Sequence, residues 1–501
     1  MTTAPAVPRA AQGFKGNDRL LTGIVLGVLT FWMFAGTVGT VARSILTDIN
    51  GAPIDQVANP VVTLDQMNLA VSITALFSGL FIVFMGGLAD RVGRVRIAVV
   101  GNVLGIVGSV LIIFADGGLA LPLLLTGRAV QGLSAACIMP ATMALVKAYW
   151  DGPGRQRAVS MWSIGSWGGS GLAAIFGGFV ASNFSWRIIF YASVVISVLA
   201  IVLIWGTPES KATEQEHKRF DVPGLAIFMV SVLALMILLI FGRQLGWTEP
   251  TTLALAAVAV VGVTAFVVFE RRQDNPFIDF ALFRNVTFTG ATISNFVLNA
   301  TIGMLIVSQQ MLQIARPELF DPWKAGLLTL GYAVAIIAFI RVGERLLRAF
   351  GPRKPMIWGA TIVAIASALL IPTNILVGPY TVLAVIAYTL FGLGLAFYAT
   401  PSTDAALSNL PPAQAGAGAG IYKMASSLGG AIGAALSLTI FTSFLGDGVT
   451  IVGELLHTQG IQENAAVRQA GMVTFMFNVV LALIAIISIT VTVPKGKKYH
   501  D

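Results

Sequence analysis

The sequence predicts an all-α membrane protein whose chain crosses a bilayer fourteen times. Three observations support this prediction: the low charge content, the succession of long apolar runs, and the position of the basic residues between those runs. Of the 501 residues, 56% are hydrophobic and only 11% are charged, whereas soluble domains carry roughly 25% charged residues. So few charges cannot cover the surface of a soluble protein of this size.

Each predicted span is an apolar run of about 20 residues, the length that crosses the hydrocarbon core. We expect the long uncharged stretch 355–403 to form two helices that separate between Pro372 and Pro379, because proline and glycine favour turns there. Nine other runs carry no charge: 20–42, 66–89, 97–115, 158–186, 188–208, 222–242, 250–269, 285–315 and 469–494. Three more each have one cation embedded between their ends: about 119–148 around Arg128, 324–345 with Arg341 and 416–443 around Lys423.

The basic residues orient these spans. With the N-terminus in the cytoplasm, 22 of the 31 Lys and Arg residues fall on the cytoplasmic side. Six fall outside: Arg43, Arg187, Arg243, Arg316, Lys324 and Arg468. Cytoplasmic loops of membrane proteins carry such an excess of positive charge. The pattern therefore predicts a multi-pass protein whose tails, residues 1–19 and 495–501, both lie in the cytoplasm, and whose first apolar run is a retained helix rather than a signal peptide.

Several function classes find no support in the residues. Cys137 is the single cysteine, which excludes an intramolecular disulfide, and the three histidines are scattered, so we expect no metal site. The basic residues form no stripe on a soluble domain, so we expect no nucleic-acid partner. The sequence contains neither a phosphate-binding loop nor a Ser–His–acid grouping. We therefore expect a protein that is not an enzyme and has no cofactor.

A short motif occurs twice. The first copy, Gly87-Leu-Ala-Asp90-Arg91-Val-Gly93-Arg94, ends the second span, and a weaker copy, Leu346 to Lys354, ends the tenth. If the seventh and eighth spans are an insertion, the chain divides into six-helix bundles at 20–208 and 288–494, joined by a linker at 209–287 that carries two extra helices. Two six-helix halves around a central site are an architecture of transporters.

These motifs resemble the major facilitator superfamily, and specifically its fourteen-helix drug:proton antiporters. The loop around Asp90 is similar to the family's signature between helices 2 and 3, and the segment Leu124 to Ala136 is similar to its helix 4 motif. Segments similar to the NorB/NorC-type quinolone exporters within this family are Trp162 to Gly171, Gly290 to Asn295, Ala399 to Asp404 and Gly420 to Gly429.

The resemblance implies a fold of two six-helix bundles plus two extra helices, and a monomer in the bacterial inner membrane. It also implies a multidrug exporter that exchanges amphipathic drugs (quinolones, cationic dyes or antiseptics) for protons by alternating access, with the proton gradient as its energy source. The alternative is a proton-coupled transporter of a native metabolite or lipid that exports drugs incidentally. Two positions depart from the family pattern: Ala173-Ala174 stands where helix 5 usually has Gly-Pro, and Ala35 where helix 1 usually has an acid.

Six residues are candidates for proton coupling or for conformational change: Arg128, Asp404, Lys423, Glu344, Arg341 and Asp48. A charge in the middle of a span must face protein or water, so Arg128 either responds to proton occupancy or binds neighbouring carbonyl groups for structure. Asp404 and Lys423 form a coupled pair in one interpretation; in the other, Asp404 caps a helix and Lys423 extends to the interface. Arg341 and Glu344, three residues apart, favour a structural pair.

A gating loop is predicted at Gly87, Asp90, Arg91, Gly93 and Arg94. A carboxylate between helix ends and arginines can hold two helices together, although an exposed cytoplasmic turn would have the same composition.

The predicted substrate cavity combines adaptable apolar side chains with a few polar ones. The amides are the more informative candidates because an amide that faces lipid is costly, whereas an aromatic residue or a methionine also serves to pack helices together. The candidates are Trp32, Phe34, Gln131, Met139, Trp162, Trp167, Asn295, Asn299, Gln309, Gln310, Tyr398 and Tyr422.

Overall fold

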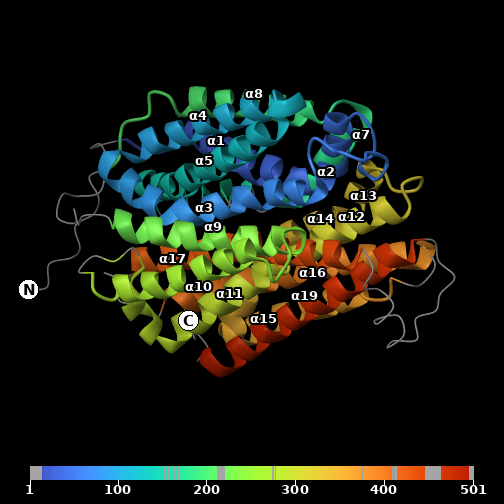
Figure 1. Ribbon diagram of the computed structural model, residues 1–501. Helices are drawn as coiled ribbons and strands as arrows, with labels where there is room; N and C mark the ends of the chain where they lie inside the picture. Colours follow the sequence, from blue (N-terminus) through green and yellow to red (C-terminus); the bar gives the residue numbers. More distant parts are fainter. Residues whose placement is uncertain are drawn as a thin grey trace, which may run out of the picture.

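The computed structural model describes most of the chain. The described residues are 14–151, 154, 157–158, 161–162, 165–166, 169–211, 221–273, 276, 278–373, 377–408, 410, 415–445 and 464–495. They form helices joined by turns. The helices form two groups that lie side by side. In Figure 1 the N-terminal group, blue to teal, lies above the C-terminal group, yellow to red.

The N-terminal group packs around α5. Its helices are α1 (Asp18–Leu29), the π-helical turn η1 (Thr30–Phe34), α2 (Ala35–Asn50), α3 (Leu64–Val92), α4 (Arg94–Ile113), α5 (Ala120–Tyr149), α7 (Gly169–Asn183) and α8 (Arg187–Ile204). Helices α3 and α4 pack on α5, α8 on α4, and α1 on α8. Local signals begin and end these helices: Thr63 and Gln66 form a reciprocal capping box at the start of α3, and Gly51, with a φ of +73°, ends α2.

The C-terminal group repeats this arrangement. Its helices are α11 (Val286–Ala300), α12 (Gly303–Ala315), α13 (Pro322–Leu327), α14 (Leu330–Phe350), α15 (Arg353–Leu369), α16 (Val377–Leu407), α17 (Ala415–Phe444) and α19 (Ala465–Thr492). Here α14 and α15 pack on α16, as α3 and α4 pack on α5. The weak sequence repeat at the ends of the second and tenth spans therefore corresponds to equivalent helices.

The two extra helices lie outside both groups. Helix α9 (Val222–Leu245) contacts both α3 and α17, and α10 (Pro250–Glu270) packs against α9. In Figure 1, α9 runs along the junction between the upper and lower groups. The pair thus covers one side of the interface between the groups without separating them.

The number of membrane crossings is established in part. In the described portion of the chain, eleven helical segments are long and apolar enough to cross a bilayer, and the bent segment from Asp18 to Asn50 brings the number to twelve. The other two predicted spans contain shorter helices, α7 with 15 residues and α15 with 17. The all-helical membrane architecture is confirmed, and the number fourteen stays a prediction.

Three of the predicted spans are interrupted rather than straight. The first bends by 44° next to the π-helical turn η1. The ninth breaks at residues 301–302, between α11 and α12, and the tenth breaks at residues 328–329, between α13 and α14. At the second and third of these breaks, backbone N–H groups donate to the carbonyl three residues back, as Thr301 does to Leu298 and Thr329 to Gly326, so the regular α-helical pattern is interrupted. Within a membrane, such irregular backbone occurs where protein or a polar cavity surrounds it.

Glycines bring α17 and α11 into backbone contact. A Cβ atom built on Gly429 would lie 2.1 Å from the carbonyl oxygen of Phe296, and one on Gly433 would lie 2.2 Å from Cα of Ala300. By contrast, a Cβ on Gly430 meets no atom within 4 Å. Small residues allow this close approach of membrane helices, so the glycine pattern of α17 distinguishes its packed face from its open face.

We expect Gly429→Ala and Gly433→Ala to lower the free energy of unfolding by about 1–3 kcal/mol, because the added methyl group forces the two backbones apart. The measurement is thermal unfolding of the purified protein in detergent. Gly430→Ala is the matched control, since its methyl group enters open space. Equal melting temperatures for all three variants would contradict this account of the contact.

Candidate functional site

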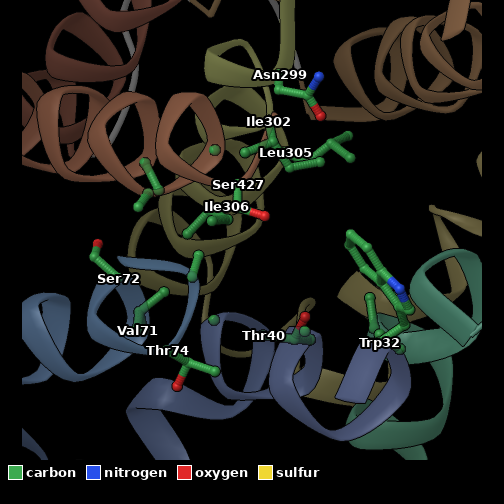
Figure 2. Close-up of a pocket in the computed structure, with 18 of the residues that line it drawn as sticks. Trp32, Thr40, Val71, Ser72, Thr74, Asn299, Ile302, Leu305, Ile306 and Ser427 are labelled. Atoms are coloured by element: carbon green, nitrogen blue, oxygen red, sulfur yellow. The ribbon is translucent and has the colours of Figure 1, made fainter. Parts of the chain in front are cut away.

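A cavity of about 230 Å³ lies between the two groups of helices. Figure 2 shows residues from both groups facing one another across it, with the ring of Trp32 opposite Leu305 and Asn299. All three interruptions described above reach it, because Trp32 of η1, Ile302 and Thr329 are among its lining residues. The breaks in the helices therefore lie beside the cavity rather than in lipid.

The walls of the cavity are mostly apolar. Phe31, Val71, Leu298, Ile306, Phe391 and Leu395 supply much of the apolar surface. The polar groups are few: the hydroxyl groups of Thr40, Ser72, Thr74, Thr329, Tyr332, Ser426 and Ser427, the amides of Asn299 and Gln309, the indole N–H of Trp32 and the Arg128 side chain. Among the described residues that line it, none is Asp or Glu. Such a wall suits an amphipathic molecule better than a sugar-like one, which needs many hydrogen bonds.

On one side of the cavity, hydrogen bonds join the two groups of helices, and we call these bonds the seal. Thr40 donates a hydrogen bond to Oε1 of Gln309 at 2.6 Å, Gln313 donates to the Thr40 carbonyl at 3.2 Å, and Arg43 donates to the Gln313 carbonyl at 2.8 Å. Nearby, the backbone N–H of Trp323 donates to Ser182 at 3.1 Å. These residues lie toward the ends of α2 and α7 and around α12 and α13, which is the external side in the predicted orientation.

Arg128 is 1% exposed and joins α5 to α3. Its Nε donates to the Ala70 carbonyl at 2.9 Å and one terminal nitrogen donates to the Val71 carbonyl at 3.3 Å. In return, the Thr74 hydroxyl donates to the Arg128 carbonyl at 2.9 Å. These contacts agree with the structural interpretation, while the position of Arg128 on the cavity wall is compatible with a role in conformational change.

A chain of hydrogen bonds continues from Arg128 into the N-terminal group. The other terminal nitrogen donates to Oε1 of Gln131 at 3.0 Å, and Gln131 donates to Ser109 at 3.2 Å. Ser109 in turn contacts Ser193 at 3.1 Å. This network connects α5, α4 and α8, so Gln131 joins helices inside the group and does not line the cavity.

Asp404 and Lys423 do not pair in this conformation. Oδ1 of Asp404 accepts a hydrogen bond from Ser408 at 2.8 Å, on its own helix. Nζ of Lys423 lies 5.3 Å from the ring centroid of Trp32, in the opposite group. The predicted pair is therefore replaced by a local contact of Asp404 and a contact of Lys423 that crosses between the groups.

Two further predicted charges have partners elsewhere. Asp48 accepts from Arg187 and from Nε1 of Trp186, the latter at 3.0 Å, at the end of α2. Glu344 pairs with Arg348, one turn further along α14. The prediction that Glu344 pairs with Arg341 was therefore wrong. The four-residue spacing suits the pair because it places the two side chains on one face of the helix.

The predicted gating loop is mostly helical. Gly87, Asp90 and Arg91 lie in the last turns of α3, which extends to Val92, and Gly93 alone separates α3 from α4. Asp90 pairs with Arg94 at 2.8 Å. The predicted contact between two helix ends is thus present, but it spans a single-residue turn.

Glu209 is the carboxylate that the sequence analysis missed at this turn. Its oxygens accept from the backbone N–H groups of Val95 at 2.8 Å and Arg96 at 3.1 Å, so it caps the N-terminus of α4. Gly93 has a φ of +135°, and a Cβ there would lie 2.4 Å from the Glu209 carboxyl carbon. The turn therefore requires glycine for two reasons, its backbone angle and the space that Glu209 occupies.

The Glu209 cap joins the segment after α8 to α3 and α4. Arg94 donates to Oγ of Ser210 at 3.2 Å, and its backbone N–H donates to the Ser210 carbonyl at 3.0 Å. These contacts all lie within the N-terminal group. We name this assembly of Asp90, Gly93, Arg94, Glu209 and Ser210 the α3–α4 clamp.

The predicted cavity residues divide into two sets. Trp32, Asn299 and Gln309 line the cavity. The remaining described candidates are buried elsewhere: Phe34, Gln131, Met139, Trp162, Asn295, Gln310, Tyr398 and Tyr422. Trp167 lies outside the described residues.

Most of the misplaced polar candidates hold helices of one group together. Trp162 donates to Thr142 at 3.0 Å, and the Tyr398 hydroxyl lies 2.7 Å from that of Ser294. Asn295 donates to the Tyr422 carbonyl at 3.0 Å. The packing interpretation, given for aromatic residues, therefore describes Trp162 and Tyr398, whereas the amide of Asn295, predicted to line the cavity, binds a neighbouring helix instead. Small hydroxyl residues such as Thr40 and Ser427 were missed because a hydroxyl group in a membrane helix usually bonds to its own backbone and gives no distinct sequence signal.

Comparison with known proteins places these features in a family. Residues 20–434 match the Major Facilitator Superfamily. The chain is 44% identical over 474 residues to the quinolone resistance protein NorB of Staphylococcus aureus (strain MRSA252), covering 94% of this chain and 97% of that protein. Identity to NorB of strain COL is 43% over 485 residues, covering 97% of each.

Solved structures show the same fold at much lower identity. A D-xylose-proton symporter superposes with a TM-score of 0.65 at 16% identity, covering 96% of this chain and 98% of that chain. An auto-inhibited peptide transporter of the POT family superposes with a TM-score of 0.65 at 14% identity, covering 97% and 99%. Both comparisons concern the arrangement of the helices.

We expect Glu209→Gln to lower the free energy of unfolding by about 1–2 kcal/mol, because the negative charge at the N-terminus of α4 is lost. Glu249→Gln is the matched control: Glu249 precedes α10, yet its side chain accepts no capping hydrogen bond. Thermal unfolding in detergent measures both variants. If the melting temperature of Glu249→Gln falls as far as that of Glu209→Gln, the α3–α4 clamp does not depend on the carboxylate.

Proposed function

Because this chain belongs to the major facilitator superfamily, a family of membrane transporters rather than enzymes, we propose that it exports amphipathic drugs in exchange for protons. The 44% identity to NorB over nearly the whole length of both proteins favours export of quinolones and similar amphiphiles. The cavity carries the proposal: it lies between two equivalent groups of helices, is largely apolar, and is bordered by hydrogen bonds that join the two groups.

The position of the seal supports alternating access. The hydrogen bonds of Thr40 and Gln309 join α2 to α12 directly across the two groups, so the groups must separate there before a substrate can leave on that side. With the N-terminus in the cytoplasm and fourteen spans, the seal is external and the cavity receives its substrate from the cytoplasm. Rocking of one group against the other about the cavity then exports the substrate.

The proton acceptor that we propose is Asp404. Four carboxylates were named in the sequence analysis, three as coupling candidates and Asp90 in the gating loop. Of these, Asp48, Asp90 and Glu344 each have an arginine partner that compensates their charge. Asp404 accepts from the Ser408 hydroxyl and forms no ion pair in the described part of the chain. Protonation of Asp404 therefore breaks no existing ion pair.

A native metabolite or lipid is the second candidate for the substrate. The apolar wall favours a lipid-like molecule over a polar metabolite, because a buried polar group without a partner is costly. Competition between a quinolone and lipid or metabolite extracts in proteoliposomes distinguishes the two substrates.

The direct test of function is transport by the purified protein in proteoliposomes with an imposed pH gradient. We expect quinolone movement against the direction of proton flow, and its collapse when an uncoupler is added. Transport that is indifferent to the gradient rules out antiport.

We expect Asp404→Asn to reduce the stimulation of transport by a pH gradient at least tenfold, while exchange of labelled for unlabelled drug continues. The reason is that the amide cannot take up and release a proton. Glu344→Gln is the control, because it breaks an exposed ion pair on a helix surface, and such pairs contribute about 0–1 kcal/mol to stability. Loss of gradient dependence in both variants, or in neither, would reject Asp404 as the acceptor.

A further inference from the structure

Lys423 is a charged side chain without a charged partner. It lies on α17, and within the described part of the chain it forms neither an ion pair nor a hydrogen bond. Its ammonium group contacts the ring of Trp32, at 5.3 Å from Nζ to the ring centroid. A ring face attracts an ammonium group less strongly than a carboxylate does, since it carries no net charge.

The position of Lys423 places the ammonium group beside the cavity. Ser426, Ser427 and Gly430 line the cavity, and Lys423 precedes them by three, four and seven residues. These spacings put Lys423 on the same face of the helix. Trp32 belongs to the cavity wall on the opposite side, so the contact joins the two groups of helices at the cavity.

The charge of the cavity has one sign. Arg128 lines the cavity, and Lys423, which is not one of the lining residues, contacts the lining residue Trp32; both side chains are basic, and the described lining residues include no Asp or Glu. The Arg128 guanidinium group is held by the carbonyl groups of α3, whereas the Lys423 ammonium group has only the ring. A negatively charged ligand group therefore finds one cation that is available to it. A permanently cationic ligand finds no opposite charge.

Trp32 has a further property that suits an aromatic ligand. Its Nε1 is buried and has no hydrogen-bond partner, so the indole is held by packing rather than by a specific polar contact. Figure 2 shows its ring reaching into the space between the groups. An aromatic ligand can stack on this ring while its acid group meets Lys423.

We propose that Lys423 binds the carboxylate of the substrate and that Trp32 packs against the aromatic part, so that the transporter selects amphiphiles with an acid group over permanently cationic ones. This inference rests on the proposed export function and names its substrate class. The carboxylate takes the place of the Trp32 ring as the partner of Lys423, which also releases a contact between the two groups of helices.

The test compares a quinolone with its methyl ester, which has the same ring system and amine but lacks the acid group. In proteoliposomes with a pH gradient, we expect the wild-type protein to transport the acid at least tenfold faster than the ester at equal low concentrations. Lys423→Met should reduce this ratio to near one, chiefly through slower transport of the acid. Lys423→Arg should retain most of the preference, because it retains the charge.

Lys354→Met is the matched control variant. Lys354 also lies over an aromatic ring, that of Phe350 at 5.6 Å, but it is exposed at the start of α15 and away from the cavity. We expect its acid-to-ester ratio to equal that of the wild type. Lys423→Gln provides a second neutral variant if Lys423→Met does not elute as a folded protein in gel filtration.

The outcomes separate this inference from the proposed function. If the wild-type protein transports neither compound, the export function fails. If it transports both equally, or if the neutral variants keep the wild-type preference for the acid, export stands and the role of Lys423 is overturned. The acid-to-ester transport ratio of the wild-type protein by itself tests the preference for acids, independently of the variants.

Discussion

The structure depends on one constraint: a polar group within the bilayer must find its partner inside the protein, because hydrocarbon offers none. Arg128 shows the constraint most clearly, since its side chain is almost fully buried and uses carbonyl groups of a neighbouring helix as acceptors. The same constraint explains why the three interrupted spans meet at the cavity. It also makes a charged group that lacks such partners, as Lys423 does, a feature that points to function.

The fold could be predicted largely from the sequence because hydropathy and the distribution of basic residues act over the whole chain. Every predicted span contains a helix, and the repeated motif corresponds to equivalent helices α3 and α14. The interruptions were not predicted. At residues 301–302, for example, the break lies within an uncharged apolar run, and hydropathy does not distinguish a continuous helix from two short ones.

The site was harder to predict because residue type does not show which way a side chain points. Asn295 and Asn299 lie one turn apart on α11, yet only Asn299 reaches the cavity, while Asn295 binds the Tyr422 carbonyl. Both were equally good candidates in the sequence. Glu209 was missed for another reason: its partners, the N–H groups of α4, are more than a hundred residues away, and no local spacing indicates such a contact.

Gly430 gives the cavity wall a position where side-chain volume is unconstrained. Its neighbours Gly429 and Gly433 are held against the backbone of α11, but Gly430 faces open space. Any side chain that replaces it grows into the room left for the substrate instead of into another helix. A single substitution at this position would therefore reduce the volume of the cavity, and with it the size of the molecule that fits there, while leaving the contact between α17 and α11 intact.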